Sequence, residues 1–501
     1  MVGRRPPGHI DAADPGWAPV SRASDPFRRP RFGPASAVRL GASLALSAIC
    51  PATVWAQEVA GPMSEPARPR LELTRWREDW SPLADPALRT EPLDRLKHLP
   101  LSEDPGDYLS LGANVRERFE AQEGALFGTA GERSDGRLLS RLQVHADLRV
   151  RDRFAAFVQL EDVRAAGLRE PGPADINHLD LAQAFVSLSG QVGALRYGVR
   201  IGRQEIGFDL ERFVSIREGP NVRQRYDAIW GEIDGEAWSL RGFVSRPVRY
   251  GSGSFDDGSD GDLLFHGLRL ERRAIGPGDL SVYFAHYERA AARYGPIAGR
   301  ERREILDLRY FKATGRLQLD LEAMAQWGAV GGRRARGWAL GTRARYAISE
   351  AGWRPKAGLQ LDLASGDGDP ADGVVETFNP LFPNGLYFTQ AGYTGYANLL
   401  HLKPSLALSP SVGVDVLAAV GVQWRATTAD AVYVQPSIPV PGTAGSPGRH
   451  SGTYGQLRVD WQVGHHVRTS VELVRFMIGD VIRRAGGRDV DYVGVEVAFA
   501  W

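Results

Sequence analysis

Apolar and polar residues alternate with a period of two over most of the chain after Gly106. The last ten residues, Tyr492–Trp501, show this most clearly, because every second position from Val493 to Trp501 is large and apolar. Successive side chains of a strand point to opposite faces, so this stretch predicts a strand with one apolar face. The same pattern recurs, between clusters of Gly, Pro and Asp, in Leu317–Trp327, Leu359–Leu363, Val412–Trp424 and Leu457–Val463.

The end of the chain favours a transmembrane barrel over a soluble β-sandwich, which also builds alternating strands. A closing strand of an outer-membrane barrel has reason to end on an aromatic residue in its apolar phase, with that phase toward lipid and the other toward the lumen. Residues 107–501, at about 22 per strand and connection, give about eighteen strands. The fold class predicted is therefore all-β, a transmembrane antiparallel barrel of the outer membrane with an aqueous lumen.

Residues 1–56 predict a leader. Basic residues precede the apolar run Leu40–Ile49, and Val54–Ala56 supplies the small residues that a signal peptidase reads. The apolar run is too short to stay as a membrane span. Because Met1–Pro34 is long and rich in Pro, either the signal is of an extended type or translation starts later. Cys50 is the only cysteine and lies in this leader, so the mature chain is expected to lack thiols.

Residues 57–106 are rich in Pro and charge and show no strand period. We expect a periplasmic segment whose Trp76 and Trp80 pack on the barrel rim; a plug in the lumen is the alternative. Without the leader, 54 basic residues face 57 acidic ones, a net charge of about −3. Bulk charge therefore points to no class of partner, nucleic acid included, and the placement of charges carries the argument.

Arginine crowds the phase predicted to face the lumen. Its guanidinium stays charged and binds two carboxylate oxygens at once, and a ring of such groups selects anions. Acidic residues of the same phase, such as Glu120 and Glu161, offer the competing explanation that the arginines form structural ion pairs. The predicted lumen set is Arg116, Arg118, Arg141, Arg149, Arg203, Gln204, Arg225, Asp227, Arg309, Arg343, Arg345 and Arg458.

The densest charged cluster lies in Leu195–Trp230. Charges at this density do not suit a lipid face, so we expect a lumen position or a connection folded inward. Within it, Arg203 and Arg225 are predicted to lie near a constriction.

Short motifs in a fixed order support this interpretation. They are Trp80-Ser81, Asp85-Pro86, Arg89-Thr90, Leu93-Asp94, Leu96-Lys97, Pro100-Leu101, Tyr108–Gly112, Arg116–Arg118, Gly202–Glu205, Arg225–Asp227, Ser365–Asp367 and Phe378–Gly385. Together they resemble the bacterial alginate export family over nearly the whole mature chain. The resemblance implies an eighteen-stranded barrel with an arginine-rich lumen that passes a polyuronate outward. It carries over Arg116, Arg118, Arg203 and Arg225, while Tyr226 stands where phenylalanine is expected.

Three connections invite further hypotheses. Asp256–Asp262 and the group Asp367, Asp369 and Asp372 place carboxylates in Gly-rich loops, which can bind Ca²⁺, but neither has the EF-hand spacing, and solvated loops are favoured. No resident metal or cofactor is predicted. The apolar, Pro-containing stretch Phe378–Phe388 is a candidate gate that folds onto the rim or into the lumen, with core residues Phe378, Asn379, Pro380, Leu381, Phe382 and Pro383.

Two classes of function remain beside the exporter. An uptake porin for small anions, such as sugar acids or aromatic acids, needs the same fold and lumen. An outer-membrane hydrolase is disfavoured, since the sequence has no Gly-x-Ser-x-Gly motif, His465-His466 is predicted to lie on the surface, and Asp320 with Glu322 is explained by lumen charge. We predict a non-enzymatic channel in contact with outer-membrane lipids, monomeric because a closed barrel leaves no free edge, and served in export by periplasmic partner proteins.

Overall fold

The computed structural model describes residues 68–129 and 134–501. All of these residues belong to one compact unit. The predicted leader and Cys50 lie outside the described residues.

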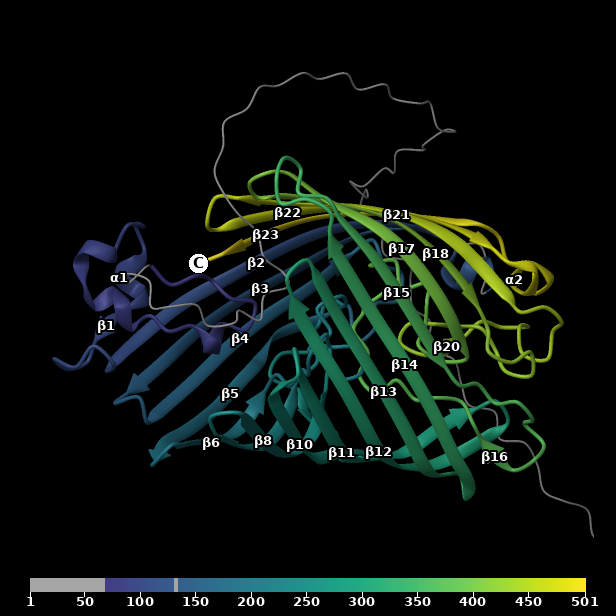
Figure 1. Cartoon of the computed structure of the whole chain (residues 1–501), viewed down its shortest axis with the longest axis horizontal. Coiled ribbons are helices and arrows are strands. Elements are labelled where there is room, and N and C mark those ends of the chain that lie inside the picture. The colour runs from purple at the N-terminus through teal and green to yellow at the C-terminus, as the bar shows by residue number, and fades with distance from the viewer. Residues whose placement is uncertain (1–67, 130–133) are drawn as a thin grey trace, which may run out of the picture. The chain divides into compact units, whose positions relative to one another are not determined.

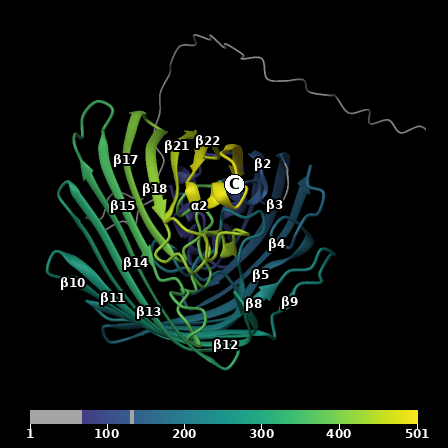
Figure 2. The same ribbon diagram turned by 90° about the vertical axis from the view of Figure 1, so that its right-hand side faces the viewer.

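Eighteen antiparallel strands form a closed barrel, which confirms the predicted fold class (Figures 1 and 2). The strands are β2 (Tyr108–Glu123), β3 (Ser134–Val150), β4 (Phe154–Ala166), β5 (Asn177–Val192), β6 (Leu195–Gln204), β7 (Tyr226–Asp234), β8 (Trp238–Arg249), β10 (Leu263–Ile275), β11 (Gly278–Tyr294), β12 (Ile297–Thr314), β13 (Leu317–Val330), β14 (Arg333–Ala347), β15 (Lys356–Ala364), β17 (Leu399–Ser411), β18 (Val414–Trp424), β21 (His450–Val463), β22 (Val467–Ile478) and β23 (Val490–Ala500).

Several short strands and helices lie between or before the strands of the barrel. They are the two-residue strands β1 (Leu99–Pro100), β9 (Gly258–Ser259), β16 (Val374–Val375), β19 (Tyr433–Val434) and β20 (Ile438–Pro439), the 3-10 helices η1 (Arg75–Arg77), η2 (Ser81–Ala84), η3 (Pro86–Leu88) and η4 (Ala125–Gly128), and the helices α1 (Asp94–Lys97) and α2 (Asp480–Arg484). Within the described ranges, no helix has the length and apolar character needed to cross a membrane.

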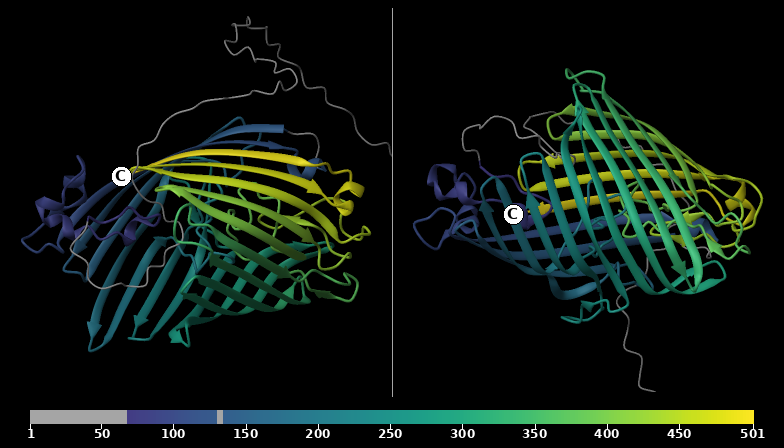
Figure 3. Two further views of the ribbon diagram at one scale, coloured as in Figure 1. Left: turned by 45° about the horizontal axis from the view of Figure 1, so that its top comes forward. Right: turned by 60° about the horizontal axis from the view of Figure 1, so that its bottom comes forward.

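The last strand closes the barrel on the first. β23 pairs with β2 from Asn114 opposite Ala500 to Gln122 opposite Tyr492, and Figure 3 shows the C-terminal strands beside β2. Val493 and Val497 are 37% and 46% exposed on the outer face, whereas Tyr492 is 1% exposed on the inner face. The alternation of the sequence therefore corresponds to outward and inward faces, as predicted.

The two ends of the barrel differ in their connections. At the end that holds Trp501, two-residue turns join several strands, among them 276–277, 315–316 and 412–413. Gly276, Gly315 and Gly413 have φ angles of 61°, 56° and 80°, which residues with a Cβ rarely adopt. The opposite end carries the long connections. Outer-membrane barrels have short periplasmic turns and long extracellular loops, so the first end is periplasmic.

Two long connections fold inside the ring of strands, where irregular segments are visible in Figure 2. We name residues 205–225, between β6 and β7, the first lumen loop, and residues 376–398, before β17, the second lumen loop. They are joined where the Phe382 amide donates to the Phe213 carbonyl at 2.9 Å. At Gly219 a Cβ would lie 2.9 Å from the Cα of Gly385, so the close approach of the two backbones requires glycine.

Aromatic side chains anchor both lumen loops to the inner wall. The ring of Phe213 lies 5.3 Å from Phe378 and 5.1 Å from Tyr396, and Phe382 lies 5.3 Å from Tyr226 on β7. Phe382 also contacts Phe265 of β10 at 5.4 Å. All six side chains are at least 95% buried, and rings at these spacings attract beyond simple area burial. We call these residues, Phe213, Tyr226, Phe265, Phe378, Phe382 and Tyr396, the aromatic cluster.

The N-terminal segment, residues 68–107, lies against the periplasmic end (Figure 1). Trp80 is 1% exposed, and its amide donates to the Tyr108 hydroxyl at 3.0 Å. Arg75 donates to the Trp501 carbonyl at 2.9 Å, and the Leu73 carbonyl accepts from Arg223 of the first lumen loop at 3.4 Å. The segment therefore contacts both the rim and a loop inside the lumen.

Candidate functional site: a charged lumen

Three arginines surround Glu218 of the first lumen loop. Arg116 on β2 and Arg141 on β3 are cross-strand neighbours, and both form ion pairs with the Glu218 carboxylate, the Arg116 pair at 3.4 Å. Arg223 of the same loop forms a third ion pair. Arg116 also donates to the Glu218 carbonyl at 3.0 Å and to the Asn221 amide oxygen at 2.8 Å. The wall of the lumen thus holds a carboxylate between guanidinium groups of two adjacent strands.

The electrostatics of Glu218 follow from this arrangement. Burial by itself would raise the pKa of Glu218, but Arg141, Arg223 and Arg116 outweigh it and hold the pKa well below its ordinary range. Glu218 is therefore ionised at any physiological pH. The site is a carboxylate-binding site that the protein fills with its own side chain.

A second loop carboxylate is bound in the same manner. Asp209 accepts two hydrogen bonds from Arg269 of β10, at 2.6 and 2.7 Å, and one from Arg309 of β12 at 2.7 Å. The loop also supplies an arginine to wall carboxylates, because Arg212 forms ion pairs with Glu322 and, at 3.3 Å, with Asp320, both on β13. Asp320 and Glu322 thus pair with arginine, in keeping with the lumen-charge explanation.

Arg203 and Arg225 lie in separate ion pairs. Arg225 is fully buried and binds both carboxylate oxygens of Glu161, one at 2.6 Å. Arg203 binds Asp227 at 2.9 and 3.2 Å, in register across β6 and β7. Gln204 is buried and donates to the Ala228 carbonyl at 3.1 Å. Their predicted position near a constriction stays a prediction.

The remaining predicted lumen arginines also have partners. Arg118 pairs with Glu120 at 2.8 Å and donates to the Gly219 carbonyl at 2.5 Å. Arg458 pairs with Asp460 at 2.8 Å and with Glu472 at 3.0 Å. The guanidinium of Arg343 lies 4.2 Å from the centre of the Tyr387 ring and donates to the Tyr387 backbone carbonyl at 2.6 Å. Arg149 forms an ion pair with Asp147. The side chain of Arg345 is partly exposed.

Sequence reasoning missed Arg269, Asp209 and Glu218. Arg269 is detectable, because Leu263–Ile275 alternates and places Arg269 on the inward phase. The two loop carboxylates follow no strand period. Only their position in an inward-folded connection gives them a role, and that position depends on tertiary packing.

The candidate gate lies in the second lumen loop, inside the barrel. Phe378 and Phe382 belong to the aromatic cluster, and the Asn379 side chain donates to Glu301 at 3.2 Å. Pro380, Leu381 and Pro383 connect these anchors, and Leu381 has a φ of 60°. Gating by these residues stays a prediction.

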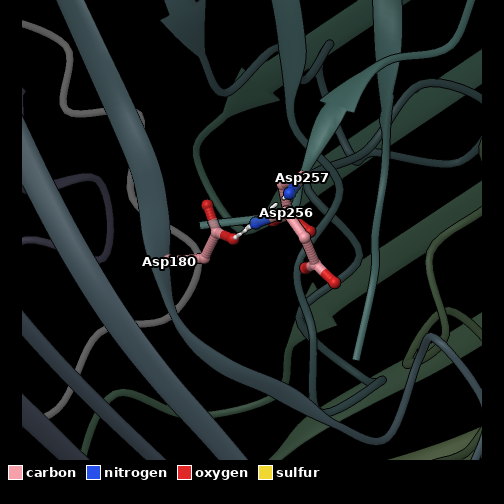
Figure 4. A group of neighbouring side chains, drawn as sticks. All are labelled: Asp180, Asp256 and Asp257. Atoms are coloured by element: carbon pink, nitrogen blue, oxygen red, sulfur yellow. Dashed lines mark hydrogen bonds between the residues drawn. The ribbon is translucent and has the colours of Figure 1, made fainter. Parts of the chain in front are cut away.

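The predicted metal loops bind backbone amides. Asp367, Asp369 and Asp372 each accept from an amide two residues further along the chain, at 3.2, 3.0 and 2.8 Å. In the other predicted loop, Asp256 and Asp257 gather with Asp180 of β5, and their carboxylate oxygens lie within 4.8 Å of one another (Figure 4). Asp180 accepts the amides of Asp256 and Asp257 at 2.8 and 3.2 Å. These amides are the partners that position the group, so the cluster is explained as a turn contact between β5 and the loop before β10.

His465, considered for an enzymatic site, lies on the exterior. Its side chain is 63% exposed and pairs with Glu91 of the N-terminal segment at 2.9 Å, while His466 lies 3.6 Å from the same carboxylate. The pair links the β21–β22 turn to the N-terminal segment.

Comparisons with known proteins agree with this geometry. Among solved structures, the chain is similar to three outer-membrane proteins of Pseudomonas aeruginosa, each of which aligns with 78% of this chain. OccK9 (OpdG) has 11% identity and a TM-score of 0.53 over 98% of its own length, and OpdO has 12% identity and a TM-score of 0.51 over 97% of its length. OpdK with vanillate has 9% identity and a TM-score of 0.50 over 98% of its length. At these identities the likeness shows the fold. No curated protein sequence matches the chain.

A family described as alginate export matches residues 107–496, which is most of the chain and all of the barrel except its last residues. The match agrees with the motifs from Tyr108 to Gly385 and with the eighteen-stranded closed barrel. The chain is an outer-membrane β-barrel channel, and it belongs to the alginate export family.

Proposed function

We propose that this channel conducts anionic saccharides, with an alginate-like polyuronate moving outward as its cargo. The observation that carries the proposal is the binding of Glu218 by Arg116 and Arg141. A uronate presents the same carboxylate group to the same fork of guanidinium donors. Wall arginines that hold a carboxylate of the chain itself have the position and the chemistry to hold one from a passing sugar acid.

The second carboxylate site strengthens the argument. Arg269 and Arg309 bind Asp209 across β10 and β12, on a different part of the wall from β2 and β3. A polyuronate carries one carboxylate per sugar, so it can contact more than one arginine site in succession. Each contact replaces an existing ion pair, which keeps the cargo from binding too tightly to move.

An uptake porin for small anions is the second candidate. OpdK, which shares the fold, was solved with vanillate, an aromatic acid. An aromatic acid would bind the same arginines through its carboxylate. The hydrolase is the weakest candidate, because the acidic pair Asp320 and Glu322 is held by Arg212 and Arg309. The expected monomeric state and periplasmic partner proteins belong to the same proposal.

Single-channel current in planar bilayers tests the function. Oligouronate added on the periplasmic side should block the current in a saturable manner, and Arg116→Gln with Arg141→Gln should weaken the block about tenfold. Arg203→Gln should weaken it less, since it removes one guanidinium group instead of two. Arg334→Gln is the matched control, because Arg334 is exposed on the outer face of β14. Block by vanillate but not by oligouronate would favour uptake of aromatic acids.

A further inference from the structure

A small pocket lies at the periplasmic mouth, between the N-terminal segment and the inner wall. Its volume is about 260 Å³, and it is lined by Trp76, Arg77, Asp147, Arg149, Phe185 and Ser187. Pockets for drug-sized ligands begin at about 300 Å³, so this one has room for a single ring with its substituents. It is separate from the arginine sites at Glu218 and Asp209, whose residues do not line it.

Aromatic rings form one side of the pocket. Trp76 meets Phe185 edge to face, with centroids 5.8 Å apart and planes at 85°. The guanidinium of Arg200 lies 4.0 Å from the centre of the Trp76 ring and holds the indole against the wall. The indole nitrogen of Trp76 is buried and has no hydrogen-bond partner among the described residues. An indole N–H that is buried in a protein usually has an acceptor.

Positive charge dominates the other side. Arg149 and Asp147 form a two-oxygen ion pair at 2.8 to 3.0 Å, so their charges offset each other. Arg77 is exposed at the mouth, and its guanidinium lies 5.3 Å from the centre of the Trp76 ring. Arg77 therefore gives the pocket a net positive charge in reach of solvent.

We propose that this pocket binds one sugar-acid ring, as the first binding position for a uronate arriving from the periplasm. The inference rests on the proposed function and adds a site to it. The Arg77 guanidinium binds the sugar carboxylate, since a charged fork matches two carboxylate oxygens. The apolar face of the sugar ring packs on Trp76 and Phe185, and Asp147 and Ser187 offer hydrogen-bond partners to its hydroxyl groups.

The pairing of an aromatic side with a cation sets the specificity. A neutral hexose keeps the ring contact and loses the carboxylate contact, so it should bind more weakly than the uronate. A small anion without a sugar ring, such as acetate, keeps the charge contact and loses the aromatic one. The pocket should therefore bind a sugar acid more tightly than it binds a neutral sugar or a small carboxylate.

Equilibrium titration of the purified full chain in detergent tests this site. Methyl glucuronoside should bind in a saturable manner, and methyl glucoside and acetate should bind at least about tenfold more weakly. Arg77→Gln should weaken methyl glucuronoside binding about tenfold, and Trp76→Leu should also weaken it. Arg70→Gln, an exposed arginine of the same segment outside the pocket, should leave the affinity within about twofold.

Ser187→Phe gives a second test that keeps both Trp76 and Arg77. The larger side chain fills the pocket, so methyl glucuronoside binding should be lost while the strand content of the circular dichroism spectrum is unchanged. Equal affinity in Arg77→Gln and in the unaltered chain, or equal binding of glucuronoside and glucoside, would overturn the proposal.

The proposed pocket and the proposed channel function can be contradicted independently of each other. Anion-selective current together with no saturable glucuronoside binding overturns the pocket and leaves the channel function intact. Saturable binding that depends on Arg77, together with cation-selective current, supports the pocket and contradicts the proposed cargo.

Discussion

The first lumen loop is held in place in two chemically different ways. At Glu218 it is held by ion pairs with Arg116 and Arg141, whereas at Phe213 it is held by rings of the aromatic cluster. An ion pair can be exchanged for another carboxylate with a small net change in free energy, because both states satisfy the same guanidinium groups. A packed ring has no such substitute in an aqueous cargo. The charged end of the loop is therefore expected to move aside for substrate while the aromatic end stays in place.

Removing the aromatic contact should have the largest effect. In Phe213→Ala with Phe382→Ala, each truncation of a buried ring costs about 3–5 kcal/mol, and both loops lose their shared anchor. Thermal unfolding should occur at lower temperature, and single-channel conductance should rise several-fold because coil leaves the lumen. Phe119→Ala, on the outer face of β2 where Phe119 is 46% exposed, is the control. An unchanged conductance would show that the aromatic cluster does not hold the loops in the pore.

Not every ion pair in the lumen should be exchangeable, and Arg225 marks the limit. Arg225→Ala leaves Glu161 buried without its partner, which should cost about 3–5 kcal/mol of unfolding free energy. Replacing both residues, as Arg225→Met with Glu161→Leu, should recover most of that loss, since neither charge remains buried. The measurement is the midpoint of denaturant unfolding followed by circular dichroism. If Arg225→Ala unfolds at the same denaturant concentration as the unaltered chain, the Arg225–Glu161 ion pair is exchangeable as well.

Glu218→Gln tests directly whether the cargo competes with the loop carboxylate for the arginines. The amide keeps the size of the side chain and removes the charge that occupies the three guanidinium groups. Oligouronate should then block the current at about tenfold lower concentration, since the arginines no longer release an internal carboxylate. Glu103→Gln, an exposed position of the N-terminal segment, should behave as the unaltered chain does. Equal block in both variants would contradict competition between Glu218 and the cargo.

A smaller effect is expected at Asp367, just before the second lumen loop. Burial, together with the neighbouring Asp430, Asp372 and Glu376, raises the pKa of Asp367 to about 6. The folded loop then holds a proton that the opened loop releases, so its stability is highest below about pH 4 and falls as pH rises through about 6. Hydrogen exchange of residues 365–376, corrected for intrinsic rates, should show this loss of protection. Asp367→Asn should remove the pH dependence.

The alternation of residues predicts the barrel well because it is a local property. Each strand, β23 for example, carries its own lipid-facing row, and closure of the barrel follows from the number of strands. The inward phase likewise places Arg116, Arg141 and Arg309 on the lumen side. What the sequence does not contain is the partner of each arginine. Glu218 and Asp209 reach their arginines only because a connection folds back inside, over a distance of 77 residues for Arg141 and Glu218.

The aromatic stretch Phe378–Phe388 shows the same limit in another form. Its apolar character predicts burial, yet either the rim or the lumen could provide it. Contact with Phe213 and Tyr226 decides for the lumen, and those residues lie more than 150 positions away in the chain. The pocket at Trp76 is beyond sequence reasoning for the same reason, because it exists only where the N-terminal segment meets β3 and β5.

The reversal potential across a salt gradient measures whether the lumen arginines make the channel prefer anions to cations. With purified protein in a planar bilayer and a tenfold KCl gradient, we expect the sign of the reversal potential to show preference for chloride, and we expect its magnitude to fall toward zero in Arg116→Gln with Arg141→Gln. A reversal potential of the opposite sign, showing preference for potassium, would rule out an anion-selective lumen and would mean that the arginines serve only to neutralise their carboxylate partners.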